Sequence, residues 1–192
     1  MALGTQAAAI LIALVAHQGT ITFTETGVSF KSLSYEYKDI QRLELMPTEI
    51  RLRTYEDRKW RLGQDREYVF NRIPPGETAK LYTLLSTRLD QPLIARVLQP
   101  VSALEWQAPA KILHRTGGTN GEFKIGTDLI VFEGPESRTW RYTDLVNVSC
   151  SNPFELSLTS LDGETRFQLK KALPEDRYNK LWRRVMETSH HD

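Results

Sequence analysis

The strongest candidates for chemistry in this sequence are four basic residues on one face of a predicted hairpin: Arg51, Arg53, Lys59 and Arg61. Residues 50–62 alternate apolar and polar side chains, which predicts two antiparallel strands with Ile50 and Leu52 pointing inward. The basic side chains then share the outer face, where guanidinium and ammonium groups can bind phosphates and carboxylates. Acidic residues nearby offer the alternative of a neutralised, solvated face: Glu49, Glu56 and Asp57.

Catalysis and metal binding have much weaker support in the sequence. A nucleophilic site needs Ser or Cys beside His with an orienting acid. No acid recurs at a fixed spacing from the four histidines: His17, His114, His190 and His191. The single cysteine, Cys150, excludes an intramolecular disulfide and a multi-cysteine metal site. We therefore expect no catalytic residue, no metal and no cofactor, and we expect that the protein is not an enzyme.

The elements that must position these residues come in two copies. The motifs G-x-Φ-x-Φ, aromatic-x-Tyr-x-Asp-Φ and Pro-x-Glu-Φ-x-Leu, where Φ is apolar, each occur twice and in the same order. They occupy residues 19–23 and 121–125, 35–40 and 140–145, and 47–52 and 153–158. A fourth match pairs two helical faces: Leu81, Leu84, Leu85 and Leu89 with Tyr178, Leu181, Trp182 and Met186. Four matches in one register indicate an internal duplication.

Each copy has the pattern of a sheet followed by one helix. Alternating apolar residues predict roughly five or six antiparallel strands per copy. Asp162-Gly163 lies between two alternating runs and predicts a type I′ hairpin turn. Pro174 suits the first turn of a helix, and Glu175 complements the helix dipole. The predicted fold class is therefore α+β and mainly β.

A bent antiparallel sheet closed by one C-terminal helix is similar to the pleckstrin-homology-like (PH-like) fold. The motifs around Tyr37 and Tyr142 resemble those of bacterial and GRAM-type PH-like domains. The resemblance implies two tandem PH-like domains, each a partly open barrel, at 19–98 and 121–192. Residues 99–120 are expected to be a connector, because they contain Pro100, Pro109, Gly117 and Gly118. The connector is expected to pack on the domains through its apolar residues: Leu104, Trp106, Ile112 and Leu113. The resemblance also implies a non-enzymatic binding module.

The N-terminal residues 1–18 form a separate apolar segment. Residues 7–16 contain no polar side chain, and this run is too short for a bilayer, which needs about 20 residues. Its length suits the apolar part of a secretory signal peptide, although no Lys or Arg precedes it. The alternative is a first strand or helix of the core. The balance favours export, for example to a periplasm, over the cytoplasm.

The overall charge narrows the choice of partner. The 192 residues carry 25 basic and 24 acidic side chains, so the formal net charge of +1 produces no strong field. Nucleic acid is disfavoured because no aromatic side chain lies among the exposed cations to stack on bases. The leading hypothesis is a binding or scaffolding module for a protein or peptide. The alternatives are binding of an anionic lipid headgroup through the four basic residues, and an enzyme with a site between the domains near Trp106 and His114.

Overall fold

The computed structural model describes residues 9–58, 61–89 and 93–189, and the side chains of 57–64 lie outside this description. The chain divides into two compact units, Met1–Leu93 and Ile94–Asp192, called unit 1 and unit 2. Within each unit the same elements follow one another: four strands, one turn of 3-10 helix, three strands and an α-helix, and in unit 2 the short strand Leu93–Ala95 precedes this series. This mainly β architecture with two α-helices confirms the predicted fold class.

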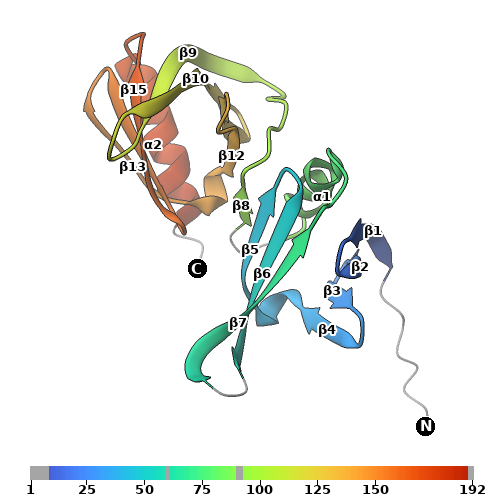
Figure 1. Cartoon of the computed structure of the whole chain (residues 1–192). Helices are drawn as coiled ribbons and strands as arrows, with labels where there is room; N and C mark the ends of the chain where they lie inside the picture. The colour runs from blue at the N-terminus through green and yellow to red at the C-terminus, as the bar shows by residue number, and fades with distance from the viewer. Residues whose placement is uncertain (1–8, 59–60, 90–92, 190–192) are drawn as a thin grey trace. The chain divides into compact units, whose positions relative to one another are not determined.

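Unit 1 contains two antiparallel sets of strands (Figure 1). The first set is β1 (Ile10–Ala16), β2 (Gly19–Thr24), β3 (Gly27–Phe30) and β4 (Leu33–Glu36). After the 3-10 helix η1 (Tyr37–Asp39) come β5 (Ile40–Met46), β6 (Glu49–Arg58), β7 (Arg61–Asn71) and helix α1 (Glu77–Leu85). Figure 1 shows the β6–β7 pair running on beyond β5. The inward side chains form the core, with Ile21, Phe23 and Leu52 completely buried.

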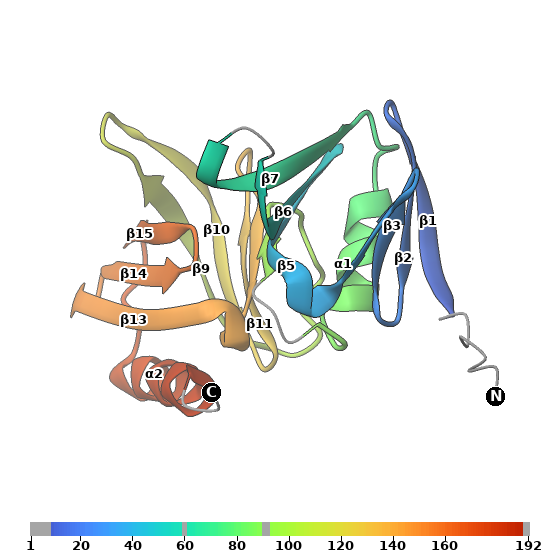
Figure 2. The same cartoon turned by 90° about the horizontal axis from the view of Figure 1, so that it is seen from below.

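Unit 2 is an open antiparallel sheet in the order β13-β14-β15-β9-β10-β11-β12-β8. Its strands are β8 (Leu93–Ala95), β9 (Leu104–Leu113), β10 (Gly118–Gly126), β11 (Leu129–Glu133), β12 (Arg138–Arg141), β13 (Leu145–Asn152), β14 (Glu155–Ser160) and β15 (Gly163–Leu169). The 3-10 helix η2 (Tyr142–Asp144) lies between β12 and β13. Helix α2 (Glu175–Ser189) lies beside β13 in both views (Figures 1 and 2).

The repeated aromatic-x-Tyr-x-Asp motif has the same role in both units. Tyr37 and Tyr142 are buried at the start of the 3-10 helices. The Tyr37 hydroxyl donates to the carbonyl oxygen of Thr24 at 2.8 Å, and the Tyr142 hydroxyl donates to that of Gly126 at 2.7 Å. In both units the acceptor lies in or at the end of the second strand, so each tyrosine ties the 3-10 helix to that strand. A buried hydroxyl needs such a partner, which explains why the motif keeps Tyr.

The helices align one turn away from the predicted match. The carbonyl oxygen of Pro74 accepts from the Glu77 N–H, and that of Pro174 accepts from the Arg177 N–H, so the two prolines lie in equivalent turns, although α1 begins at Glu77 and α2 at Glu175. Leu81 and Leu85 of α1 then match Leu181 and Val185 of α2, and these four side chains are buried. Trp182, which the sequence placed on the buried face beside Leu181, is 46% exposed. The predicted pairing of Leu85 with Trp182 is therefore wrong.

Two local expectations also need correction or refinement. The segment 99–120 contains β9, which pairs with β10 on one edge and β15 on the other, so it is an integral strand and not only a connector. The hairpin turn falls at Leu161 and Asp162, and among the described non-glycine residues only Lys31 and Arg72 have positive φ, so the turn is not type I′. Gly163, with a φ of 114°, instead follows the turn.

The apolar N-terminal run contributes a strand to unit 1. Residues 10–16 form β1, which pairs with β2 and buries Leu14 and Ala16. Export stays a prediction. Among the described residues, no helix is long and apolar enough to cross a membrane.

Candidate functional site

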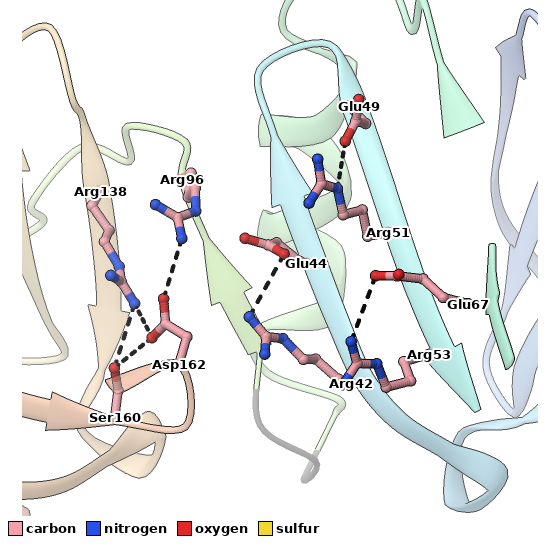
Figure 3. A network of polar contacts seen from close by, with 10 residues as sticks. All are labelled: Arg42, Glu44, Glu49, Arg51, Arg53, Glu67, Arg96, Arg138, Ser160 and Asp162. Carbon is pink, nitrogen blue, oxygen red and sulfur yellow. Dashed lines mark hydrogen bonds and ion pairs between the residues drawn. The ribbon is translucent and has the colours of Figure 1, made fainter. Parts of the chain in front are cut away.

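The outer face of β5, β6 and β7 holds the predicted basic residues that the structure describes. Arg51 Nε lies 2.6 Å from Glu49 Oε1, and Arg53 Nη2 lies 3.9 Å from Glu67 Oε1 across the β6–β7 pair (Figure 3). A third pair joins Arg42 to Glu44 at 3.7 Å. Basic and acidic side chains therefore alternate over the described part of this face. Lys59 lies outside the described residues, and Arg61 begins β7 with a side chain that is not described.

The edge of β7 offers a different kind of site, made of backbone groups. β7 is the last strand of its sheet, and no described strand pairs with its outer edge. At Asn71 this edge meets only the β1–β2 turn, where the Asn71 N–H donates to Gln18 Oε1 at 3.0 Å and the Asn71 carbonyl accepts from the His17 N–H at 2.8 Å. Because alternate residues of a strand direct their backbone groups to the same edge, Val69 and Glu67 also present theirs there.

In unit 2 the matching edge, that of β15, is covered by a neighbouring strand. There β9 pairs antiparallel with β15, from Arg166 opposite Leu113 to Leu169 opposite Ala110. Ala110 corresponds to Ala16, because each pairs with the glycine that opens its repeated motif. β1 turns back immediately after Ala16, whereas β9 continues to Leu113. The described part of unit 1 therefore lacks the strand segment that covers this edge in unit 2.

Aromatic side chains line the inner side of the open edge. The Phe30 ring lies 4.7 Å from Tyr68 and 4.9 Å from Phe70, both in edge-on contact, and Tyr35 lies 5.8 Å from Tyr68 between ring centroids. Tyr68 and Phe70 alternate along β7 with the outward residues Glu67 and Val69. A strand added to β7 would therefore place alternate side chains against this aromatic cluster.

Three hydrogen-bond donors converge beside these rings. Tyr35, Arg66 and Tyr68 form the tyrosine cradle, in which the two hydroxyls are 2.6 Å apart and Arg66 Nη1 donates to the Tyr68 hydroxyl at 3.2 Å. The occupant is the carboxylate of Glu56, whose Oε2 accepts from the Tyr35 hydroxyl at 3.0 Å and from Arg66 Nη1 at 3.1 Å. Burial and the hydrogen bond to Tyr68 raise the pKa of Tyr35, so it stays a protonated donor at neutral pH.

The matching place in unit 2 is filled by a buried ion cluster (Figure 3). Asp162, which corresponds to Glu56, pairs with Arg138, accepts from the Ser160 hydroxyl at 2.8 Å and lies 3.5 Å from Arg96. Its side chain is 5% exposed, against 55% for Glu56. Burial alone would raise the pKa of Asp162, but the charge of Arg138 together with the hydrogen bonds from Arg138 and Ser160 outweighs burial, and the pKa is lowered. The Asp162 carboxylate of unit 2 is therefore buried in its ion pairs, whereas the Glu56 carboxylate of unit 1 is accessible to solvent.

Unit 2 also has an open cleft of about 380 Å³. Its apolar lining includes Leu98, Leu104 and Val131. The charged groups of the lining, Lys124 and Glu133, bond each other at 2.6 Å. Because these charges already satisfy one another, the cleft offers an apolar surface and no converging charge for a ligand.

The residues named for an enzyme site do not come together. Trp106 is buried in the core of unit 2, and His114 follows the far end of the same strand, eight residues and about 26 Å away. His114 Nε2 lies 3.0 Å from Glu136 Oε1, and the Thr119 hydroxyl donates to the same carboxylate oxygen. His114 Nε2 also lies 3.4 Å from the Thr119 hydroxyl, whose proton is directed to the carboxylate. Among the described residues, no group of three metal-ligating side chains gathers anywhere.

Comparison with known proteins gives weak likenesses only. No protein-family model matches the chain, and no curated protein matches it. The C-terminal domain of an unknown protein from Leishmania infantum is 13% identical, covers 58% of this chain and 96% of its own, and has a TM-score of 0.35. The Spt16D Pob3N heterodimer is 10% identical with coverages of 76% and 77% and a TM-score of 0.31. The linker-DH/PH domains of p115-RhoGEF are 10% identical, with coverages of 45% and 29% and a TM-score of 0.30. These scores are too low to assign a family or a function.

Sequence reasoning missed the open edge and the tyrosine cradle. Tyr35 belongs to the repeated motif, and Glu56 was noted only as a neutralising charge. Arg66 and Tyr68 lie in β7, which has 11 residues where β15 has 7, and by strand pairing they correspond to Gly163 and Thr165. That difference in length was the available signal.

Proposed function

We propose that the protein is a non-enzymatic binding module made of two tandem PH-like units, and that unit 1 binds an extended segment of a partner protein. The segment would join β7 as an added antiparallel strand. The shared element order and the equivalent tyrosines Tyr37 and Tyr142 support the tandem relationship. The observation that carries the binding proposal is that β9 covers the edge of β15 in unit 2, while the outer edge of β7 has no strand neighbour in the described part of unit 1.

Strand addition suits the groups that this edge presents. Glu67 and Val69 each offer one N–H and one C=O to the open edge, and each hydrogen bond formed there contributes about 0.5–1.5 kcal/mol net. Backbone bonding supplies affinity, and side-chain pockets supply specificity. Here the inward residues of the added strand would contact Tyr68 and its aromatic neighbours, and the outward residues would lie beside Glu67. The proposed ligand is therefore an extended segment with an apolar residue facing inward.

The proposal is tested with a phage-displayed library of random dodecapeptides selected on the full chain. Selected peptides are measured by fluorescence anisotropy against the wild type, Val69→Pro and Val69→Thr. Proline removes one outward N–H and is tolerated at an edge position, whereas threonine keeps the N–H. We expect at least a tenfold loss of affinity for Val69→Pro, little change for Val69→Thr, and slower hydrogen exchange at Glu67 and Val69 in the complex.

A second measurement covers the case in which Val69→Pro does not fold. Peptides methylated on alternate backbone nitrogens are added to the wild-type protein, and only one of the two alternating sets should lose binding. Failure to select any peptide, or equal binding by both sets, overturns the proposal. Flotation of the chain with phosphatidylserine-containing vesicles, abolished by Arg51→Ala with Arg53→Ala, would favour the anionic-lipid alternative instead.

A further inference from the structure

We infer that the segment bound at β7 carries a carboxylate, which displaces Glu56 from the tyrosine cradle. This inference rests on the proposed function and specifies its ligand. Arg66 and Tyr68 lie on the inner side of β7, the side that inward residues of an added strand would contact. A ligand on this edge therefore comes close to the tyrosine cradle, in which Tyr35 and Arg66 now hold the Glu56 carboxylate.

Glu56 has the features of a replaceable occupant. Its carboxylate is bonded through Oε2 to Tyr35 and Arg66, yet its side chain is 55% exposed. Tyr35, by contrast, is only 5% exposed and its ring is fixed among Phe30 and Tyr68. The Tyr35 donor is thus held in place by packing, while the Glu56 acceptor is a side chain in contact with solvent. Exposed ion pairs of this kind contribute about 0–1 kcal/mol, so exchange for another carboxylate costs little.

The chemistry of the cradle favours a carboxylate over a phosphate. It contains one cation, Arg66, and two neutral hydroxyls, Tyr35 and Tyr68. One guanidinium balances the single charge of a carboxylate, whereas a phosphoryl group carries about −1.5 to −2 at pH 7. The carboxylate comes either from an Asp or Glu side chain or from the C-terminus of the segment, and both sources present the same group to the donors.

Unit 2 explains why the site belongs to unit 1. Asp162 occupies the matching position there, but it is bonded to Arg138 and to Ser160 within the fold, and its side chain is 5% exposed. No ligand can replace it without uncovering Arg138. The open edge and the exchangeable carboxylate therefore occur together in unit 1 and are both lost in unit 2.

The experiment uses the selected dodecapeptides in matched pairs, with each Asp or Glu changed in turn to Asn or Gln, and with a free or an amidated C-terminus. Affinities are measured for the wild type, Glu56→Gln and Arg66→Gln. Glu49→Gln on the outer face of β6 is the matched control. Glu56→Gln should raise the affinity of carboxylate peptides about threefold to tenfold, and Arg66→Gln should lower it about tenfold. Both variants should leave the carboxamide peptides within about twofold of the wild type.

The outcomes separate the inference from the proposed function. If peptides protect Glu67 and Val69 from exchange but Glu56→Gln leaves or lowers their affinity, the carboxylate inference is wrong and strand addition stands. A preference for phosphorylated peptides over carboxylate peptides would also overturn it. If no peptide binds at β7, both fall. The response to a free or amidated C-terminus identifies which source of carboxylate the cradle accepts.

Discussion

Replacing Glu105 by Gln tests how α2 is held to β9 in unit 2. The Glu105 carboxylate accepts from Arg184 Nη1 at 3.0 Å and Nη2 at 2.8 Å, and from Lys180 Nζ at 2.6 Å. Arg184 Nη1 also donates to the Gly126 carbonyl at 3.0 Å and its guanidinium lies over the Tyr142 ring. A Gln side chain has nearly the same shape but lacks the charge, so the variant removes the electrostatic part of this contact.

The size of the effect follows from the pKa of Glu105. Hydrogen bonds from Arg184, helped by Lys180, lower this pKa from 4.5 to about 2. Such a difference corresponds to roughly 3 kcal/mol at about 1.36 kcal/mol per pKa unit. Lys180 is 47% exposed, so solvent screens part of the interaction, and we expect about 1–2 kcal/mol of lost stability at pH 7. Because the folded-state pKa is the lower one, the contribution is full above pH 4.5 and is lost as the pH falls toward 2.

Urea denaturation followed by tryptophan fluorescence measures this loss. Trp106 and Trp140 are buried in unit 2, so the signal reports chiefly on that unit. The control is Glu164→Gln on β15, an exposed carboxylate whose replacement should change stability by less than about 0.5 kcal/mol. Equal stability of Glu105→Gln and the wild type at pH 7 would refute the reasoning. So would a difference between them that stays the same at pH 2.5.

Four further substitutions, in two pairs, test packing and the buried ion cluster by urea denaturation. Leu181→Ala should cost about 2–4 kcal/mol of stability because its side chain is buried. Trp182→Ala should cost less than about 1 kcal/mol because half of that side chain is already in water. If Trp182→Ala costs more than Leu181→Ala, the helix register predicted from the sequence is restored. Asp162→Asn should cost about 3 kcal/mol because it leaves Arg138 buried without its counter-charge. The matching change in unit 1, Glu56→Gln, should cost less than about 1 kcal/mol, and equal costs would contradict the contrast between a locked and an exchangeable carboxylate.

The sequence predicted those features that depend on local pattern. Buried alternation identified the strands that carry Ile21 and Leu52, and the repeated motif identified Tyr37 and Tyr142 as equivalent positions. β9 was not recognised because Pro109 suggests a connector. In the structure Pro109 lacks only a donor, and its carbonyl still accepts from the Lys170 N–H at 2.8 Å. A strand can therefore run through a proline when the missing N–H is not needed.

Sequence patterns could not predict which charged side chains pair across neighbouring strands. Glu49 was correctly named as a neighbour of Arg51, but Arg53 pairs with Glu67, which lies on the opposite strand. That partner depends on the register of β6 and β7, which is set by the length and bulges of their hairpin. Glu56, expected to neutralise the basic face, points to the other side and enters the tyrosine cradle. A shift of one residue in register would have reversed both placements.

The length of one hairpin accounts for the different fates of the two matching carboxylates. In unit 2 the chain turns at Leu161 and Asp162, so Asp162 sits at a tight turn and faces Arg138, which stacks on the Trp140 ring. In unit 1 the strands continue past Glu56. Tyr35 takes the position of Trp140, and its hydroxyl donates to the carboxylate, whereas the Trp140 indole ring offers Arg138 a surface on which to stack. The same edge that unit 2 covers with β9 is left open beside that donor. The longer hairpin thus leaves the Glu56 carboxylate in an accessible place, whereas the Asp162 carboxylate lies in a buried ion pair, and the proposed binding site rests on this contrast.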